Sequence, residues 1–197
     1  PLTKFAQLTQ LDLSSNLLQD LRPLETLTKL NQLSLNGNQL KDISTLATLR
    51  NLTRLGLTDN QLSDLSSLVS LNSLTHLKLA FNQIRDLRPL AALTYLEELV
   101  LTHNQIDNIQ PLSSLTNLML LSLNENRITD AQSLASLTEL RMLDLAQNQL
   151  KDVRSLSNLP HLTELNLQDN PLAEALCHVK PVDVCNLLLL HKKIITS

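Results

Sequence analysis

Residues 30–43 read "LNQLSLNGNQLKDI", and most of the chain is a series of variants of this stretch. Leucines stand at positions 30, 33, 35 and 40, an asparagine at position 38 and an aspartate at position 42. The arrangement recurs every 22 residues with no insertion, at Asn16, Asn38, Asn60, Asn82, Asn104, Asn126, Asn148 and Asn170. Self-similarity at a fixed period predicts a solenoid, an elongated domain in which each repeat contacts mainly its neighbours.

Each repeat is predicted to contain one strand with a single apolar face. In "LTQLDL", Leu11 and Leu13 alternate with Gln10 and Asp12, which is the period of two of a half-buried strand. Parallel sheets are usually covered on both faces, yet every strand here alternates, so one face must stay open to water. We expect this open face to be the concave side of a horseshoe.

Polar columns accompany the leucines. The recurring asparagine is expected to turn its amide inward and satisfy backbone groups of its own and the adjacent turn, since a buried polar group needs partners. The return segment begins with residue types that cap a short helical or 3-10 turn, namely Asp20, Asp42, Asp64, Asp86, Asn108, Asp130 and Asp152. Pro23, Pro89 and Pro111 fall within the first turn, where a missing N–H costs little.

The same acidic column allows a second interpretation, a ladder of calcium sites on successive coils. Calcium-binding β-helices carry a Gly-Asp-rich pattern that this repeat lacks. Lys41, Arg85 and Lys151 also lie beside the acids. Capping is therefore the favoured role of the column.

The whole frame resembles a leucine-rich repeat, as shown by Leu30, Leu33, Leu35, Asn38, Leu40, Asp42, Ile43, Leu46 and Leu49. Its length and the segments "DLRPL" and "NIQPL" are similar to phosphatase-regulatory repeat proteins and bacterial internalin-like proteins. The resemblance covers Pro1 to about Ala175. It implies a right-handed α/β horseshoe with a parallel concave sheet and short helical or 3-10 convex segments. We divide this single domain into a truncated repeat (1–7), repeats (8–172) and a C-terminal cap (173–197).

The two ends of the chain differ from the repeats. Pro1, Leu2, Phe5 and Leu8 align with the second half of the next repeat, so the chain is predicted to begin halfway through one. Towards the C-terminus, the pattern ends after "LTELNLQDNPL". Leu187–Leu190 are too few to span a membrane, which takes ~20 apolar residues, and we expect them to close the end of the core.

Cys177 and Cys185 are the only cysteines, and both lie in the C-terminal cap. The stretch "CHVKPVDVC" is similar to the caps of secreted bacterial leucine-rich-repeat proteins, and this resemblance implies a disulfide and an oxidising compartment. Two buried free thiols are the alternative. A zinc site with His178 and His191 is disfavoured, because an adjacent Cys-His pair lacks the usual ligand spacing.

Neither catalysis nor nucleic-acid binding is indicated. The sequence holds no glycine-rich phosphate loop, no G-x-S-x-G and no H-E-x-x-H motif. Its 16 basic and 19 acidic residues give a net charge of −3, without a basic stripe. We therefore expect no cofactor, no metal and no membrane insertion, and a monomeric chain that presents a binding surface.

Aligning the repeats gives three lateral rows of solvent-facing strand positions, with neighbours about 4.8 Å apart. The first row holds Gln10, Gln32, Arg54, His76, Glu98, Leu120, Met142 and Glu164. The second holds Asp12, Ser34, Gly56, Lys78, Val100, Ser122, Asp144 and Asn166. The third, directly before the asparagine, holds Ser15, Gly37, Asp59, Phe81, His103, Glu125, Gln147 and Asp169. The middle repeats carry the larger, charged or apolar members of these rows.

The candidate partner-binding residues are taken from these middle repeats. Phe81 is one of only three aromatic residues, and its sister positions are small, polar or His, so the core has no need of an aromatic ring there. Its ring is expected on the concave rim, although it has a simpler possible role in shielding the hydrogen bonds of Asn82. Exposed apolar residues clustered in a polar frame mark interaction sites. The full candidate set is Arg54, His76, Lys78, Phe81, Glu98, Val100, His103, Leu120 and Met142.

The sequence thus predicts a non-catalytic protein-recognition module that binds a protein on its concave face. One alternative is an adhesive ectodomain of a bacterial surface or secreted protein, with a host protein or glycan as ligand. Another is the recognition arm of a larger enzyme. A secreted or extracytoplasmic location is favoured over the cytoplasm, because of the paired cysteines.

Overall fold

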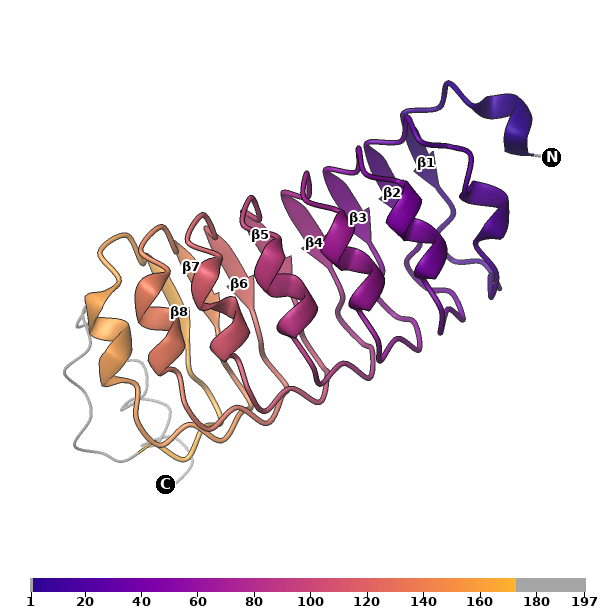
Figure 1. Cartoon of the computed structure of the whole chain (residues 1–197). Coiled ribbons are helices and arrows are strands. Elements are labelled where there is room, and N and C mark those ends of the chain that lie inside the picture. The colour runs from indigo at the N-terminus through magenta and orange to yellow at the C-terminus, as the bar shows by residue number, and fades with distance from the viewer. Residues whose placement is uncertain (1, 173–197) are drawn as a thin grey trace.

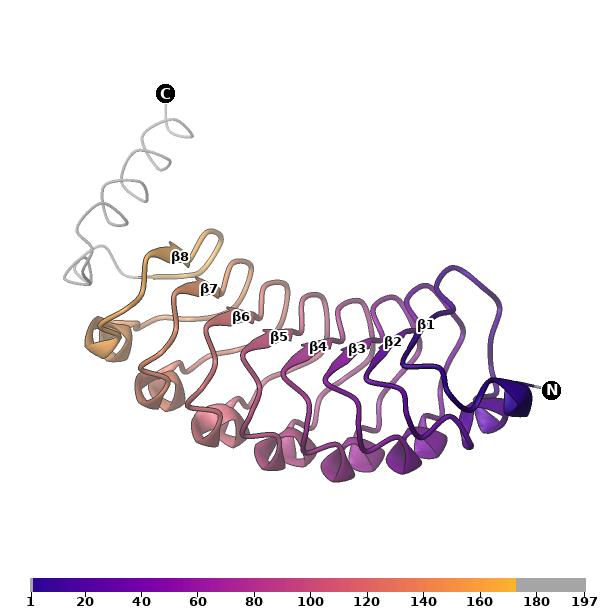
Figure 2. The same cartoon turned by 90° about the horizontal axis from the view of Figure 1, so that it is seen from above.

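The computed structural model describes residues 2–172, which form one curved solenoid (Figure 1). Eight strands pair in parallel and in chain order; their sheet lines the inner side of the curve, and 3-10 helices line the outer side (Figure 2). The strands are β1 (Gln10–Asp12), β2 (Gln32–Ser34), β3 (Arg54–Gly56), β4 (His76–Lys78), β5 (Glu98–Val100), β6 (Leu120–Ser122), β7 (Met142–Asp144) and β8 (Glu164–Asn166). The 3-10 helices are η1 (Leu2–Phe5), η2 (Arg22–Leu24), η3 (Ser44–Thr48), η4 (Ser66–Ser70), η5 (Arg88–Ala92), η6 (Gln110–Ser114), η7 (Gln132–Ser136) and η8 (Arg154–Asn158). The expected fold class is confirmed.

The core is a stack of leucine layers, one for each repeat. Leu74, Leu77 and Leu79 in and around β4 are fully buried. Neighbouring strands are in register at a shift of one repeat, so Leu77 pairs with Leu55 on one side and Leu99 on the other. Burial of each such side chain contributes about 1.5–3 kcal/mol. Because the same leucine layer recurs, each added repeat extends the core. The leucines cover only one face of the sheet, and the other face stays open to solvent.

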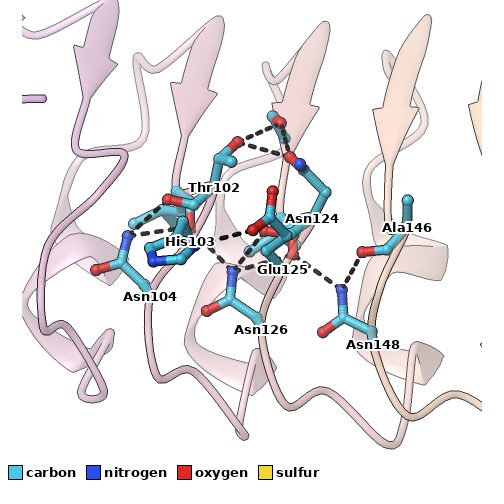
Figure 3. A network of polar contacts seen from close by, with 11 residues as sticks. Thr102, His103, Asn104, Asn124, Glu125, Asn126, Ala146 and Asn148 are labelled. Carbon is cyan, nitrogen blue, oxygen red and sulfur yellow. Dashed lines mark hydrogen bonds and ion pairs between the residues drawn. The ribbon is translucent and has the colours of Figure 1, made fainter. Parts of the chain in front are cut away.

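The recurring asparagines form a ladder of inward-facing amides, as the sequence predicts. Asn104 Nδ2 donates to the carbonyl oxygens of Leu101 and Thr102 in its own repeat, at 3.1 and 3.2 Å, and of Leu79 in the preceding repeat, at 3.0 Å. Its Oδ1 accepts the N–H of Ile84, at 2.9 Å (Figure 3 shows the asparagine side chains). Each buried amide therefore ties one coil to the coil before it.

The acidic column caps the 3-10 turns, which confirms the favoured role. Asp86 Oδ1 accepts the N–H of Arg88, the first residue of η5, at 3.0 Å, and Asn108 does the same for Gln110 at 2.9 Å. In three repeats the carboxylate also pairs with the arginine that it caps, at Arg22, Arg88 and Arg154. These contacts hold the pKa of Asp86 below its usual value, first through the side-chain bond to Arg88 and then through its backbone N–H. Within residues 2–172, no three His, Cys, Asp or Glu side chains form a candidate metal cluster.

The third row does not lie on the strands, which corrects the expectation that all three rows do. Each strand ends at the second row. After two further residues the chain bends, at the third-row residue and the asparagine that follows it, in each of the first seven repeats. Third-row residues have positive φ angles, for example 56° at Asp59, 55° at Phe81 and 63° at Gly37. A left-handed residue cannot continue an extended strand. This turn directs the following asparagine into the core and lifts the third-row side chain to the rim of the sheet.

The C-terminal cap lies outside the described residues. This applies to the predicted disulfide between Cys177 and Cys185, the disfavoured zinc site and the expected role of Leu187–Leu190. None of the helices that the structure describes is both long and apolar enough to cross a bilayer.

Candidate functional site

The open face of the sheet carries two straight rows of side chains. Strand pairing places Arg54 beside His76, His76 beside Glu98, Glu98 beside Leu120, and Leu120 beside Met142. In the second row, Lys78 lies between Gly56 and Val100. The register therefore brings seven of the nine candidate residues together on the middle strands. The other two, Phe81 and His103, lie on the turns beyond β4 and β5.

Arg54, His76, Lys78 and Glu98 form a polar network across β3, β4 and β5. Lys78 Nζ lies 3.2 Å from Glu98 Oε1, and His76 Nε2 lies 3.8 Å from Glu98 Oε2. On the other side, His76 Nε2 lies 3.5 Å from a guanidinium nitrogen of Arg54. Glu98 is thus paired with Lys78 on β4, while Arg54 has only a weak contact with an imidazole.

The network borders a shallow hollow of about 470 Å³ on the face of β1–β5. Most of the residues that line it are polar, among them Gln32, Asn36, Arg54, His76 and Lys78. The expected site begins at the third repeat, but this hollow extends back to Gln10 on β1.

The structure explains why position 56 is a glycine, which alignment of the repeats does not. The side chain of Asn36 lies over it, and a Cβ atom built on Gly56 would stand 2.8 Å from Asn36 Oδ1. Asn36 in turn accepts the N–H of Thr58 at 2.9 Å and donates to Ser34 Oγ at 2.8 Å. A side chain at Gly56 would displace this amide, so the position stays bare beside Arg54.

An apolar group lies next to the network on β5–β7. Leu120 and Met142 are adjacent in the first row, and Val100 is on the neighbouring strand in the second row. Met142 is 40% exposed, and the other two are partly buried. Met119, which is 37% exposed and directly precedes β6, was missed by the sequence prediction. The signal was available, because its sister positions in the other repeats are polar: Thr9, Asn31, Thr53, Thr75, Glu97, Arg141 and Thr163.

Phe81 and His103 form an exposed aromatic pair at the rim of the sheet. Phe81 is 47% exposed, and its ring stacks on His103 with centroids 4.9 Å apart. His103 Nδ1 lies 2.8 Å from Glu125 Oε2 (Figure 3). The backbone of Phe81 is held in its left-handed conformation by a bond from its N–H to the Thr102 carbonyl at 2.9 Å. The ring lies at the rim, as the sequence predicts, and in a conformation that costs a non-glycine residue free energy.

The candidate residues thus separate into three neighbouring groups: a charged network, an apolar group and an aromatic pair. The parallel sheet, the inward asparagines and the 3-10 turns define this protein as a solenoid of the leucine-rich-repeat class.

Comparisons with known proteins agree. A family model described as "Leucine Rich repeats (2 copies)" matches residues 6–48, 50–92 and 138–180, and one described as "Leucine rich repeat" matches residues 94–150. The chain therefore belongs to the leucine-rich-repeat family, and it is of the internalin-like type. A comparison with curated proteins gives no match.

Among solved structures, the chain is similar to two internalins of Listeria monocytogenes. Internalin inlF is 34% identical with a TM-score of 0.86, and the match covers 93% of this chain and 54% of that protein. Internalin C2 is 34% identical with a TM-score of 0.85, covering 88% of this chain and 77% of that protein. The chain thus spans about half the length of inlF.

A plant protein shares the fold as well. The ectodomain of the Arabidopsis thaliana receptor kinase GASSHO1/SCHENGEN3, solved in complex with CASPARIAN STRIP INTEGRITY FACTOR 2, is 30% identical with a TM-score of 0.75. That match covers 83% of this chain and 21% of the plant ectodomain. The same repeat architecture therefore occurs in a protein with a bound partner.

Proposed function

We propose that this protein is a non-catalytic protein-recognition module that binds a partner protein on the concave face of its sheet. The observation that carries the proposal is the juxtaposition of a charged network and an exposed apolar group on β3–β7. Protein interfaces combine apolar anchors with a polar rim. The leucine and asparagine frame accounts for folding, and these outward-facing residues are not needed by it.

The aromatic pair supports the same surface. Phe81 is exposed and has a left-handed backbone conformation, and the sister positions in the other repeats carry Ser, Gly, Asp, His, Glu or Gln. Strained conformations persist where the surrounding structure imposes them, and they are concentrated at functional sites. We assign Phe81 and His103 to the edge of the partner-binding surface.

Site-specific photocrosslinking tests this proposal in cells of the source organism. A photoreactive residue is placed at Gln32 or Asp144, which adjoin the candidate residues on the sheet. Control positions are Ser44 and Gln132, which are exposed on η3 and η7 of the convex side. We expect one partner protein to crosslink from both sheet positions and from neither helix position. A partner captured only from the convex positions contradicts the proposal.

A second candidate function is favoured by the similarity to Listeria internalins. In this alternative the chain is an adhesive ectodomain of a bacterial surface or secreted protein. A disulfide between Cys177 and Cys185 belongs to this proposal, because disulfides persist in oxidising compartments. Intact mass of unreduced protein from its native compartment tests it. A mass two hydrogens below that of the reduced chain supports secretion, and free thiols favour the cytoplasm.

A further inference from the structure

The hollow over β1–β5 contains a cation that its surroundings do not neutralise. Arg54 is the one arginine on a strand within residues 2–172, and no carboxylate of the described residues forms an ion pair with it. By contrast, Arg22, Arg85, Arg88 and Arg154 each pair with an aspartate. A guanidinium has five N–H donors, and its best acceptors are carboxylates bound through two parallel bonds.

The tautomer of His76 follows from the repeat and explains how Arg54 is held. Thr75 Oγ1 lies 3.1 Å from the Thr53 carbonyl and 2.8 Å from His76 Nδ1. Thr53 and Thr163 make the same bond to the carbonyl one repeat earlier, so the Thr75 hydroxyl proton is assigned to that bond. Its oxygen must then accept from His76 Nδ1–H. His76 Nε2 is left as the acceptor that faces Arg54, at the long distance of 3.5 Å.

An imidazole nitrogen at that distance is a weak partner for a guanidinium, which prefers a carboxylate bound through two parallel bonds. The other carboxylates of the hollow do not compete. Glu98 is already held by Lys78 at 3.2 Å. Asp12 lies two strands away on β1, about 10 Å by the spacing of strands, and it accepts the N–H of Ser14 at 2.9 Å. Arg54 itself is exposed on this face of the sheet.

The first row contains both this arginine and two residues of the apolar group. Arg54, Leu120 and Met142 are first-row residues on β3, β6 and β7. Three strand spacings separate Arg54 from Leu120, about 14 Å, and four separate it from Met142, about 19 Å. An extended chain advances ~3.4 Å per residue and places every second side chain on one face. Residues i, i+4 and i+6 of an extended segment therefore match the three positions, on one face of that segment.

We propose that the partner contributes an extended segment that lies across the strands, with an acidic side chain on Arg54 and apolar side chains four and six residues away on Leu120 and Met142. This inference rests on the proposed concave binding surface and specifies the chemistry of its ligand. Lys78 adds positive charge beside the carboxylate, since it lies on β4, the strand next to Arg54.

The test uses the peptide acetyl-Glu-Ser-Gly-Ser-Leu-Ser-Leu-amide and the same peptide in reversed order, because the chain direction is open. Binding is followed by NMR titration of the labelled protein, through the Arg54 Nε–H and the methyl groups of Leu120 and Met142. We expect one of the two peptides to shift all three signals. The matched peptide with Gln in place of Glu is expected to bind about fivefold more weakly, at the upper end of what a solvated ion pair contributes.

Two variants assign the effect to its residue. Arg54→Gln removes the difference between the Glu and Gln peptides, whereas Arg154→Gln, on convex helix η8, leaves it unchanged. A peptide with its two leucines moved by one position, onto the opposite face, is expected to lose the methyl shifts. Equal binding of the Glu and Gln peptides, or no binding by any peptide, overturns this inference. The crosslinking result described above is independent of these peptides, so a failure here leaves the proposed concave binding surface to its own test.

Discussion

Asn82 and Phe81 are adjacent in the chain, but they belong to columns with opposite properties. The asparagine column is the same in every repeat, and Asn82 is 8% exposed, with its amide bonded to two coils. The column before it holds seven residue types in eight repeats, and Phe81 is 47% exposed. A position that the core requires tolerates one residue type. The third-row position requires a left-handed backbone but no particular side chain. It therefore accepts many residue types, and its side chain is available for binding.

The largest effect is expected in the asparagine column. Asn104→Leu removes one donor group and one acceptor from a buried site, leaving the N–H of Ile84 without its partner and the Leu79 carbonyl with only its bond from Asn82. We expect the free energy of unfolding to fall by about 1–3 kcal/mol or more, because each unsatisfied buried group costs that amount. Chemical denaturation measures this loss.

Two controls separate the ladder from a general effect of leucine. Gln105→Leu changes the exposed residue next to Asn104 and should cost little. Asn16→Leu should also cost little, because Asn16 is exposed and its side chain bonds only Leu13 and Ser14 of its own repeat. Equal denaturation midpoints for all three variants would remove the ladder from the account of stability.

The second prediction concerns the variable column. Phe81→Ala is expected to weaken binding of the natural partner by about 1–3 kcal/mol, as truncation of an aromatic anchor does, with little change in thermal stability. Ser15→Ala, at the sister position of the first repeat, should change neither quantity. Titration calorimetry with the crosslinked partner and a thermal melt measure both. A lower melting temperature with intact binding would assign Phe81 to shielding of Asn82.

The third prediction concerns backbone strain at position 81 and expects a smaller difference, between the stabilities of the glycine and alanine variants. Because φ at Phe81 is 55°, Phe81→Gly should be more stable than Phe81→Ala by about 1 kcal/mol. Gly37→Ala places the same strain in the second repeat, where φ is 63°, and should lower stability by a similar amount. Denaturant midpoints of the three variants test this. No difference between the glycine and alanine variants at position 81 would mean that the turn relaxes.

The smallest effect is expected at the caps on the convex side. The pKa of Asp86 is lowered in the folded protein, so its ionised carboxylate stabilises the fold above the unfolded-state pKa, and this stability is lost as the pH falls through the folded pKa. Asp86→Asn keeps the capping oxygen, as Asn108 does, but loses the ion pair with Arg88. The variant should be slightly less stable than the parent at neutral pH and equal to it in acid. A difference that persists in acid would point to the cap geometry instead.

The repeat could be predicted from the sequence because its contacts are periodic. A fixed 22-residue spacing places equivalent positions of successive repeats side by side. Alignment of the repeats therefore predicts the row that contains Arg54, Glu98 and Leu120, and also the inward asparagines and the capping aspartates. The exposure of Phe81 followed from the same comparison, since its sister residues are polar. Binding by these residues stays a prediction.

Only the tertiary structure determined the backbone conformations and side-chain contacts that depend on a particular pair of neighbouring residues. The left-handed backbone of the third row arises where the chain leaves the strand to turn its asparagine inward, and residues as different as Phe81 and Asp59 give no sign of it. Asn36 over Gly56, and Arg54 facing only an imidazole, depend on which rotamers fill the space between coils. Periodicity determines which positions meet, because the backbone repeats. The contacts made there depend on side-chain shape and charge, which do not repeat.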